Sequence, residues 1–83
     1  MRVNEETQER TVTVTRGCLM VSFQSNEMET PKRMIDWEIA NGIFPIKGTS
    51  YSGLGRYGAT FRNEDAERVL EQIRLMFPEY DIP

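Results

Sequence analysis

The chain has 83 residues, a net charge of −3, one cysteine and no histidine. Near this length a folded chain hides only about 60% of the surface that its unfolded form exposes, so we expect one domain of modest stability without a deep catalytic cavity. The lone cysteine excludes an intramolecular disulfide, and the lack of histidine excludes the usual zinc sites built from Cys and His.

The residue inventory argues against catalysis. Histidine, the commonest general base, is missing, and Cys18 has no evident activating partner. We therefore expect a small acidic protein that is not an enzyme and that needs no metal or cofactor. A chain with one cysteine fits a reducing setting best, so we expect a cytoplasmic location. Residues 1–9 contain no apolar run typical of a signal peptide or membrane anchor.

A polar arm is predicted ahead of the domain. Residues 1–9 are rich in glutamate and contain no apolar run, so we expect a flexible N-terminal arm followed by a single α+β domain at residues 10–83. A domain of this size would bury more apolar surface by dimerising, so we expect a homodimer and a monomer equally.

The first two strands are predicted to form a hairpin. In residues 11–15 threonine and valine alternate strictly, and the run 18–23 continues the pattern. A two-residue turn between these runs would pair Val14 with Leu19, and a bulged turn is the alternative. The buried face of this hairpin is predicted to comprise Val12, Val14, Leu19, Val21 and Phe23.

A helix is predicted over residues 30–41. Thr30 is a favourable N-cap, the proline after it suits the first helical position, and Gly42 supplies the left-handed residue that often ends a helix. We expect Ile35 and Ile39 to contact the sheet.

A second pair of strands is predicted after this helix. The apolar run 43–47 contains a proline, which restricts it to an edge strand or a bulge. Residues 48–58 are rich in glycine, serine and tyrosine and are predicted to form a loop or a wide hairpin connection. A strand at residues 57–62 follows.

The last helix has the strongest pattern in the chain. Between Asn63, its predicted N-cap, and Phe77, apolar residues recur at the period of one helix face. Leu75 falls on the opposite side and becomes a contact residue only if Tyr80 or Ile82 packs beside it to form a patch. The predicted buried stripe comprises Ala66, Val69, Leu70, Ile73, Met76 and Phe77.

The element order is strand, strand, helix, strand, strand, helix. Antiparallel strands need only short connections, and two amphipathic helices are enough to cover one face of a small sheet. We therefore predict an α+β two-layer sandwich, in which an antiparallel sheet of about four strands carries both helices on one face.

Two local patterns resemble ligand-binding motifs. Residues 53–58 fit G-x-G-x-x-G and resemble the glycine loop of protein kinases, which joins two strands. The other motifs of such an enzyme are missing, so we interpret this one as a hairpin loop. Residues 57–67 resemble the third strand and second helix of an RNA-recognition motif, whose strand aromatics stack on bases. Gly58 stands at one of those stacking positions here.

Residues 47–62 are the candidate binding segment. There is no Asp or Glu between residues 39 and 63. Tyrosine and arginine often anchor protein interfaces, so we expect a regulatory or inhibitory protein, of the phage inhibitor or adaptor type, that binds another protein. RNA or single-stranded nucleic acid is the alternative partner. A further alternative is that these arginines form ion pairs with the chain's own carboxylates and have no binding role. The candidate partner-binding residues are Lys47, Tyr51, Arg56, Tyr57, Arg62 and Leu75.

Overall fold

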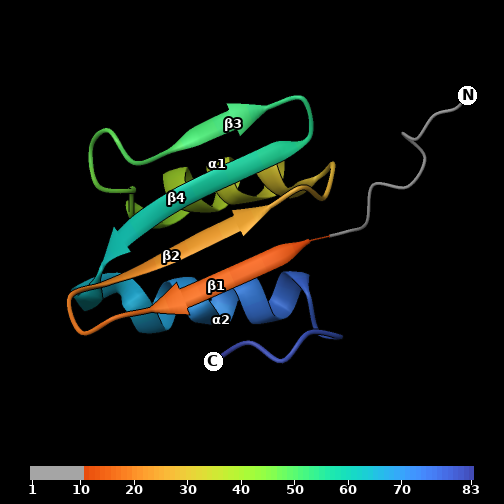
Figure 1. The fold of residues 1–83 in the computed structure, drawn as a ribbon. Coiled ribbons are helices and arrows are strands. Elements are labelled where there is room, and N and C mark those ends of the chain that lie inside the picture. The colour runs from red at the N-terminus through yellow and green to blue at the C-terminus, as the bar shows by residue number, and fades with distance from the viewer. Residues whose placement is uncertain (1–10) are drawn as a thin grey trace, which may run out of the picture.

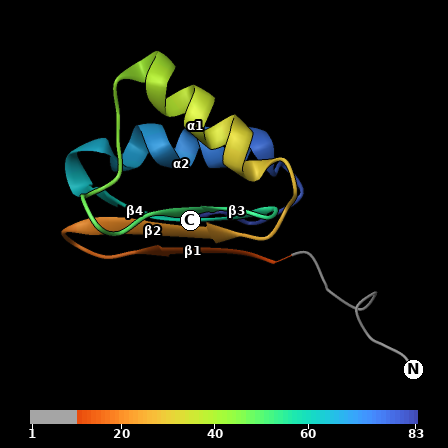
Figure 2. The ribbon, with the colours of Figure 1, turned by 90° about the horizontal axis from the view of Figure 1, so that it is seen from above.

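A computed structural model describes residues 11–83 and confirms the α+β two-layer sandwich (Figure 1). The predicted arm at residues 1–9 lies outside the described residues. Four antiparallel strands form one sheet in the order β1-β2-β4-β3, and both helices cover the same face (Figure 2). The elements are β1 (Val12–Arg16), β2 (Met20–Ser25), α1 (Thr30–Asn41), β3 (Tyr51–Gly53), β4 (Arg56–Arg62), the 3-10 turn η2 (Asn63–Asp65) and α2 (Ala66–Met76).

The core fills the space between the sheet and the two helices. Alternate residues of β2 and β4 point toward the helices, as the period of two in a strand requires. All six residues of the predicted stripe on α2 are buried, which confirms the prediction for this helix. The sheet side of the core comprises Val21, Phe23, Tyr57, Ala59 and Phe61.

The β1–β2 hairpin is confirmed, but its predicted register is wrong. Val14 pairs with Phe23 and not with Leu19, because residues 17–20 form a longer loop closed by a 2.8 Å hydrogen bond from Gly17 N to Met20 O. The shift is by an even number of residues, so the other predicted core residues keep their face. Leu19 alone leaves it, lying 74% exposed in the loop.

Helix α1 has the predicted bounds but a different inner face. Ile35 and Ile39 are exposed, whereas Thr30 and Glu38 are buried together with Met34. The spacing of four residues places these three on one side of the helix. Polar contacts with the sheet fix this rotation: the Thr30 hydroxyl lies 2.8 Å from Ser25 Oγ, and Glu38 bonds to β4.

The ends of the helices differ from the predicted caps. The N-cap position of α1 is Glu29 and that of α2 is Asp65, and neither makes a side-chain capping bond. Thr30 does not cap because its hydroxyl bonds to Ser25, while Asn63 begins the 3-10 turn that precedes α2. At the other end of α1, Gly42 adopts a φ of 67° as predicted, and its N–H bonds to the Glu38 carbonyl.

The third strand lies later in the chain than predicted. Residues 43–47 form no strand, in keeping with the proline they contain, and only Ile46 bonds to β4, through a 2.8 Å contact from its N–H to Thr60 O. The strand that pairs with β4 is instead β3, within the segment predicted to be a loop or hairpin connection. Across residues 11–83, no helix is both long and apolar enough to cross a membrane.

Candidate functional site

The glycine motif forms the tight turn of the β3–β4 hairpin. Gly53 pairs with Arg56, and the two residues between them, Leu54 and Gly55, have φ values of 54° and 77°. Positive φ at both central positions defines a type I′ turn, in which asparagine followed by glycine is the usual sequence. The motif therefore forms a hairpin turn, as predicted, and leucine takes the position where asparagine is common.

Leu54 is fully exposed at the tip of this hairpin. Its side chain has a relative exposure of 101%, and it is the one non-glycine residue with positive φ in the described part of the chain. A left-handed backbone costs a side chain such as leucine about 1–2 kcal/mol. Burial of the leucine side chain does not offset this cost within residues 11–83.

Tyr51 lies across the open face of the sheet, the face that carries no helix. It pairs with Gly58, and a Cβ atom added to Gly58 would lie 2.3 Å from the Tyr51 ring. The ring therefore rests on the glycine backbone and remains 53% exposed. With Leu54 and the exposed Arg56, it lines a shallow hollow of about 520 Å³. We call Tyr51, Leu54 and Arg56 the hairpin surface.

The predicted site residues do not all meet at this surface. Tyr51 and Arg56 lie in it, and Lys47 is exposed in the segment that leads to β3. Arg62 is at the other end of β4, six residues from Arg56, which corresponds to about 20 Å along a strand. Leu75 is 69% exposed on α2, in the helical layer (Figure 2).

Tyr57 is the predicted site residue that never reaches the surface. It is 2% exposed because it points toward the helices, while its neighbour Arg56 points away from them. Its hydroxyl donates a hydrogen bond to Glu38 Oε2, and its ring centroid lies 5.6 Å from that of Phe23. It is therefore a core residue that joins β4 to α1.

The Glu38–Tyr57 pair is unusual in its electrostatics. Burial raises the pKa of the Glu38 carboxyl, and the hydrogen bond from Tyr57 partly opposes this shift. Burial, together with the nearby Glu38 carboxyl, raises the pKa of Tyr57, which therefore remains a hydrogen-bond donor at neutral pH. Glu38 was not among the predicted core or site residues, although its spacing of four and eight residues from Met34 and Thr30 placed it on the same helix face.

We expect Glu38→Gln to change how stability depends on pH. Below the ordinary pKa of 4.5, Glu38 is protonated in both folded and unfolded chains, so burial of charge costs nothing. As pH rises through the higher pKa of the folded state, the wild type loses stability and the glutamine variant does not. Urea unfolding from about pH 4.5 to 8 measures this difference. The exposed Glu71→Gln is the control for loss of one negative charge, and a Glu38→Gln difference that is constant with pH would contradict the prediction.

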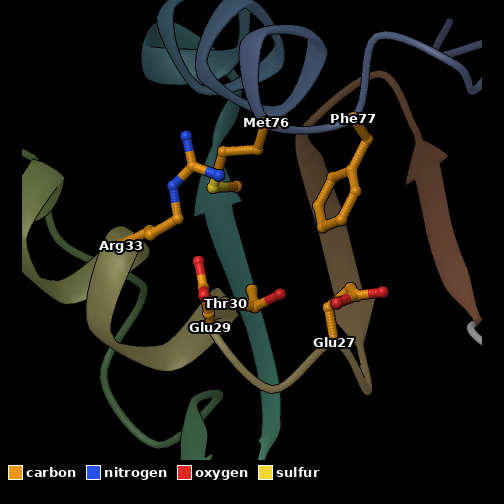
Figure 3. A pocket seen from close by; sticks show the side chains of 6 residues that line it. All are labelled: Glu27, Glu29, Thr30, Arg33, Met76 and Phe77. Carbon is orange, nitrogen blue, oxygen red and sulfur yellow. The ribbon is translucent and has the colours of Figure 1, made fainter.

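A second hollow lies between the start of α1 and the end of α2 (Figure 3). Arg33 extends from α1 toward Met76, while Phe77 points toward the sheet. The hollow measures about 110 Å³, which is the volume of only about four water molecules in the liquid, at ~30 Å³ each. It therefore gives no candidate substrate site.

The described residues hold no cluster that suits a metal ion: nowhere in 11–83 do three His, Cys, Asp or Glu side chains gather. Cys18 is a free, exposed thiol in the β1–β2 loop. No family model, curated protein or solved structure matches the chain.

Proposed function

We propose that this chain is a small, non-enzymatic regulatory or inhibitory protein that binds another protein through the hairpin surface. The observation that carries the proposal is Leu54, an apolar side chain with a relative exposure of 101% and a φ of 54° at the hairpin tip. Both properties are unfavourable in the isolated domain. Insertion of this side chain into an apolar pocket of a partner would recover about 1.5–3 kcal/mol of burial free energy.

The residues around Leu54 support a protein partner. Tyrosine and arginine are enriched among the residues that dominate protein–protein binding energy, and Tyr51 and Arg56 flank the leucine on the two strands. The Tyr51 ring is already held against Gly58, so little side-chain entropy is lost when a partner covers it. Strand β3 is also at the edge of the sheet, next to this surface.

Single-stranded nucleic acid is a second candidate partner, and the open face of the sheet supports it. Tyr51, Arg56 and Arg62 all lie on this face, and none of its strand residues in the described chain is acidic. Recognition of this kind uses aromatic stacking and phosphate contacts. It is the weaker candidate because Tyr57 points into the core and leaves Tyr51 as the single aromatic among the described strand residues of this face.

The decisive variant for a protein partner is Leu54→Asn. Asparagine suits a type I′ turn, so we expect thermal stability to rise by about 3–6 °C, which corresponds to roughly 0.5–1 kcal/mol. We also expect affinity for the partner to fall about 30-fold, as for a central interface residue. The experiment is a pull-down from the source cell with wild-type and variant chains, followed by mass spectrometry and measurement of Kd.

The matched control is Leu75→Asn, which removes an exposed leucine from the helical layer. A protein retained by the wild type and by this control, but lost by Leu54→Asn, supports the proposal. Equal retention by all three chains contradicts it. The second candidate is tested by binding to mixed oligonucleotides. If the wild type binds them with a steep salt dependence, and Arg56→Ala reduces that dependence, the partner is nucleic acid and not a protein.

A further inference from the structure

A pocket of about 270 Å³ lies between α1 and β3. Its walls differ in chemistry: Ile35 and Pro45 are apolar, whereas Ser50 and Ser52 carry hydroxyls. Glu38 and Tyr57, the buried pair described above, also line it. The pocket therefore combines an apolar wall, two hydroxyls and one carboxyl group.

The Glu38 carboxyl in this pocket is only partly satisfied. The residue is 7% exposed, and Oε2 accepts the hydrogen bond from Tyr57. Within residues 11–83, Oε1 has no hydrogen-bond partner, and the pocket lining includes no Lys or Arg. A buried carboxylate without a counter-charge is strongly unfavourable, and a cation placed beside it removes much of that cost.

We propose that this pocket binds the cationic head of an alkylammonium or alkylguanidinium group. Glu38 Oε1 accepts a charge-assisted hydrogen bond from the head group, and the hydroxyls of Ser50 and Ser52 accept others. The methylene chain of the ligand lies along Ile35 and Pro45, as the stems of Lys and Arg do on apolar surfaces. This binding site goes beyond the proposed function and does not depend on the hairpin surface.

Two sources of this cation share the same chemistry. One is a free amine or guanidine, and the other is a Lys or Arg side chain of an extended peptide. β3 is an edge strand, and Ser52 faces the helix side with its pair Tyr57, so a peptide strand added to β3 has a route for one side chain into the pocket. A peptide source predicts tighter binding than the free ligand and chemical-shift changes along the β3 backbone.

The test is a titration of the full chain with n-butylguanidinium, followed by NMR of the backbone amides. We expect saturable shifts at residues 50–53 and 57, and none with n-butanol. Glu38→Gln should weaken binding about tenfold or more, whereas the exposed Glu29→Gln should not. The same titration with an acetylated Val-Arg-Val amide distinguishes the peptide source from the free one. Absence of saturable shifts, or equal affinity in Glu38→Gln, overturns the proposal.

The wild type gives a second test in case Glu38→Gln does not fold. The titratable side chains that face the bound cation are Glu38 on α1 and Tyr57 on β4; Tyr51 also borders the pocket, but its ring lies on the open face of the sheet, against Gly58. Of these, only the carboxyl loses its charge on mild acidification, so affinity for n-butylguanidinium should fall as pH is lowered from about 8 to about 4.5. A constant affinity over this range overturns the proposal.

Discussion

Ile73→Asp is expected to abolish the cooperative unfolding transition of the domain. Ile73 is fully buried at the centre of the α2 stripe, where a carboxylate loses its water and gains no partner. The cost of several kcal/mol compares with a total stability of about 4–12 kcal/mol for a chain of this length. Thermal and urea unfolding followed by near-UV and far-UV circular dichroism should show no native baseline.

The control for this variant is two positions further along the same helix. Leu75 is 69% exposed, so Leu75→Asp introduces the same charge into water and should change stability by at most about 0.5 kcal/mol. If Ile73→Asp kept a native transition while Leu75→Asp unfolded, the helix would face the sheet with its other side.

Phe23→Ala should produce the second large loss of stability. The ring is fully buried, and its centroid lies 5.6 Å from that of Tyr57 and 6.2 Å from that of Phe77, so it joins β2 to β4 and to the end of α2. Truncation of such a ring costs about 3–5 kcal/mol in lost burial and in cavity formation. Urea unfolding should show a markedly lower midpoint with a similar slope.

The neighbouring Gln24→Ala provides the matched control for Phe23→Ala. Gln24 is exposed, and its side chain points to the open face. We expect a change within about 0.5 kcal/mol. If the two variants lost comparable stability, the β1–β2 hairpin would not bury one face in preference to the other.

Periodicity explains why most of the fold is predictable from the chain. The stripe on α2 and the alternation in β1 and β2 are local patterns, and each identifies its buried face without knowledge of the partner. The hairpin register illustrates the limit of such patterns. Alternation defines which side of a strand is buried, but it does not distinguish registers that differ by an even number of residues, so the loop before Met20 was misplaced.

The rotation of α1 was not predictable because polar side chains determine it. Hydropathy favoured Ile35 and Ile39 as inner residues, yet the structure buries Thr30 and Glu38 with hydrogen bonds to the sheet. The partner of Glu38 lies 19 residues further along the chain. A buried polar residue is stable only with such a partner, and the sequence does not show which partner the fold supplies.

Only some of the candidate site residues were predicted correctly, because the sequence alone does not show which neighbouring side chains share a surface. Arg56 and Tyr57 are adjacent, but neighbours on one strand point to opposite faces of the sheet, so they do not share a surface. Leu54 was missed because an isolated leucine between glycines carries no signal until both turn residues are known to have positive φ. Only part of the segment 47–62 is exposed: Tyr51 and Arg56 are, whereas Tyr57 and Phe61 are buried.

The pairing of β2 with β4 has a consequence for how the domain folds. Each hairpin, β1 with β2 and β3 with β4, closes through a short turn, whereas Ser25 meets Tyr57 only after the chain has enclosed α1 and the segment that follows it. Closing that long loop costs conformational entropy, and the hydrogen bonds and packing between β2 and β4 compensate for this cost only once the two strands have met. We therefore expect the pairing of β2 with β4 to limit the rate of folding, and until it forms the facing edges of these two strands are open to pairing with other chains.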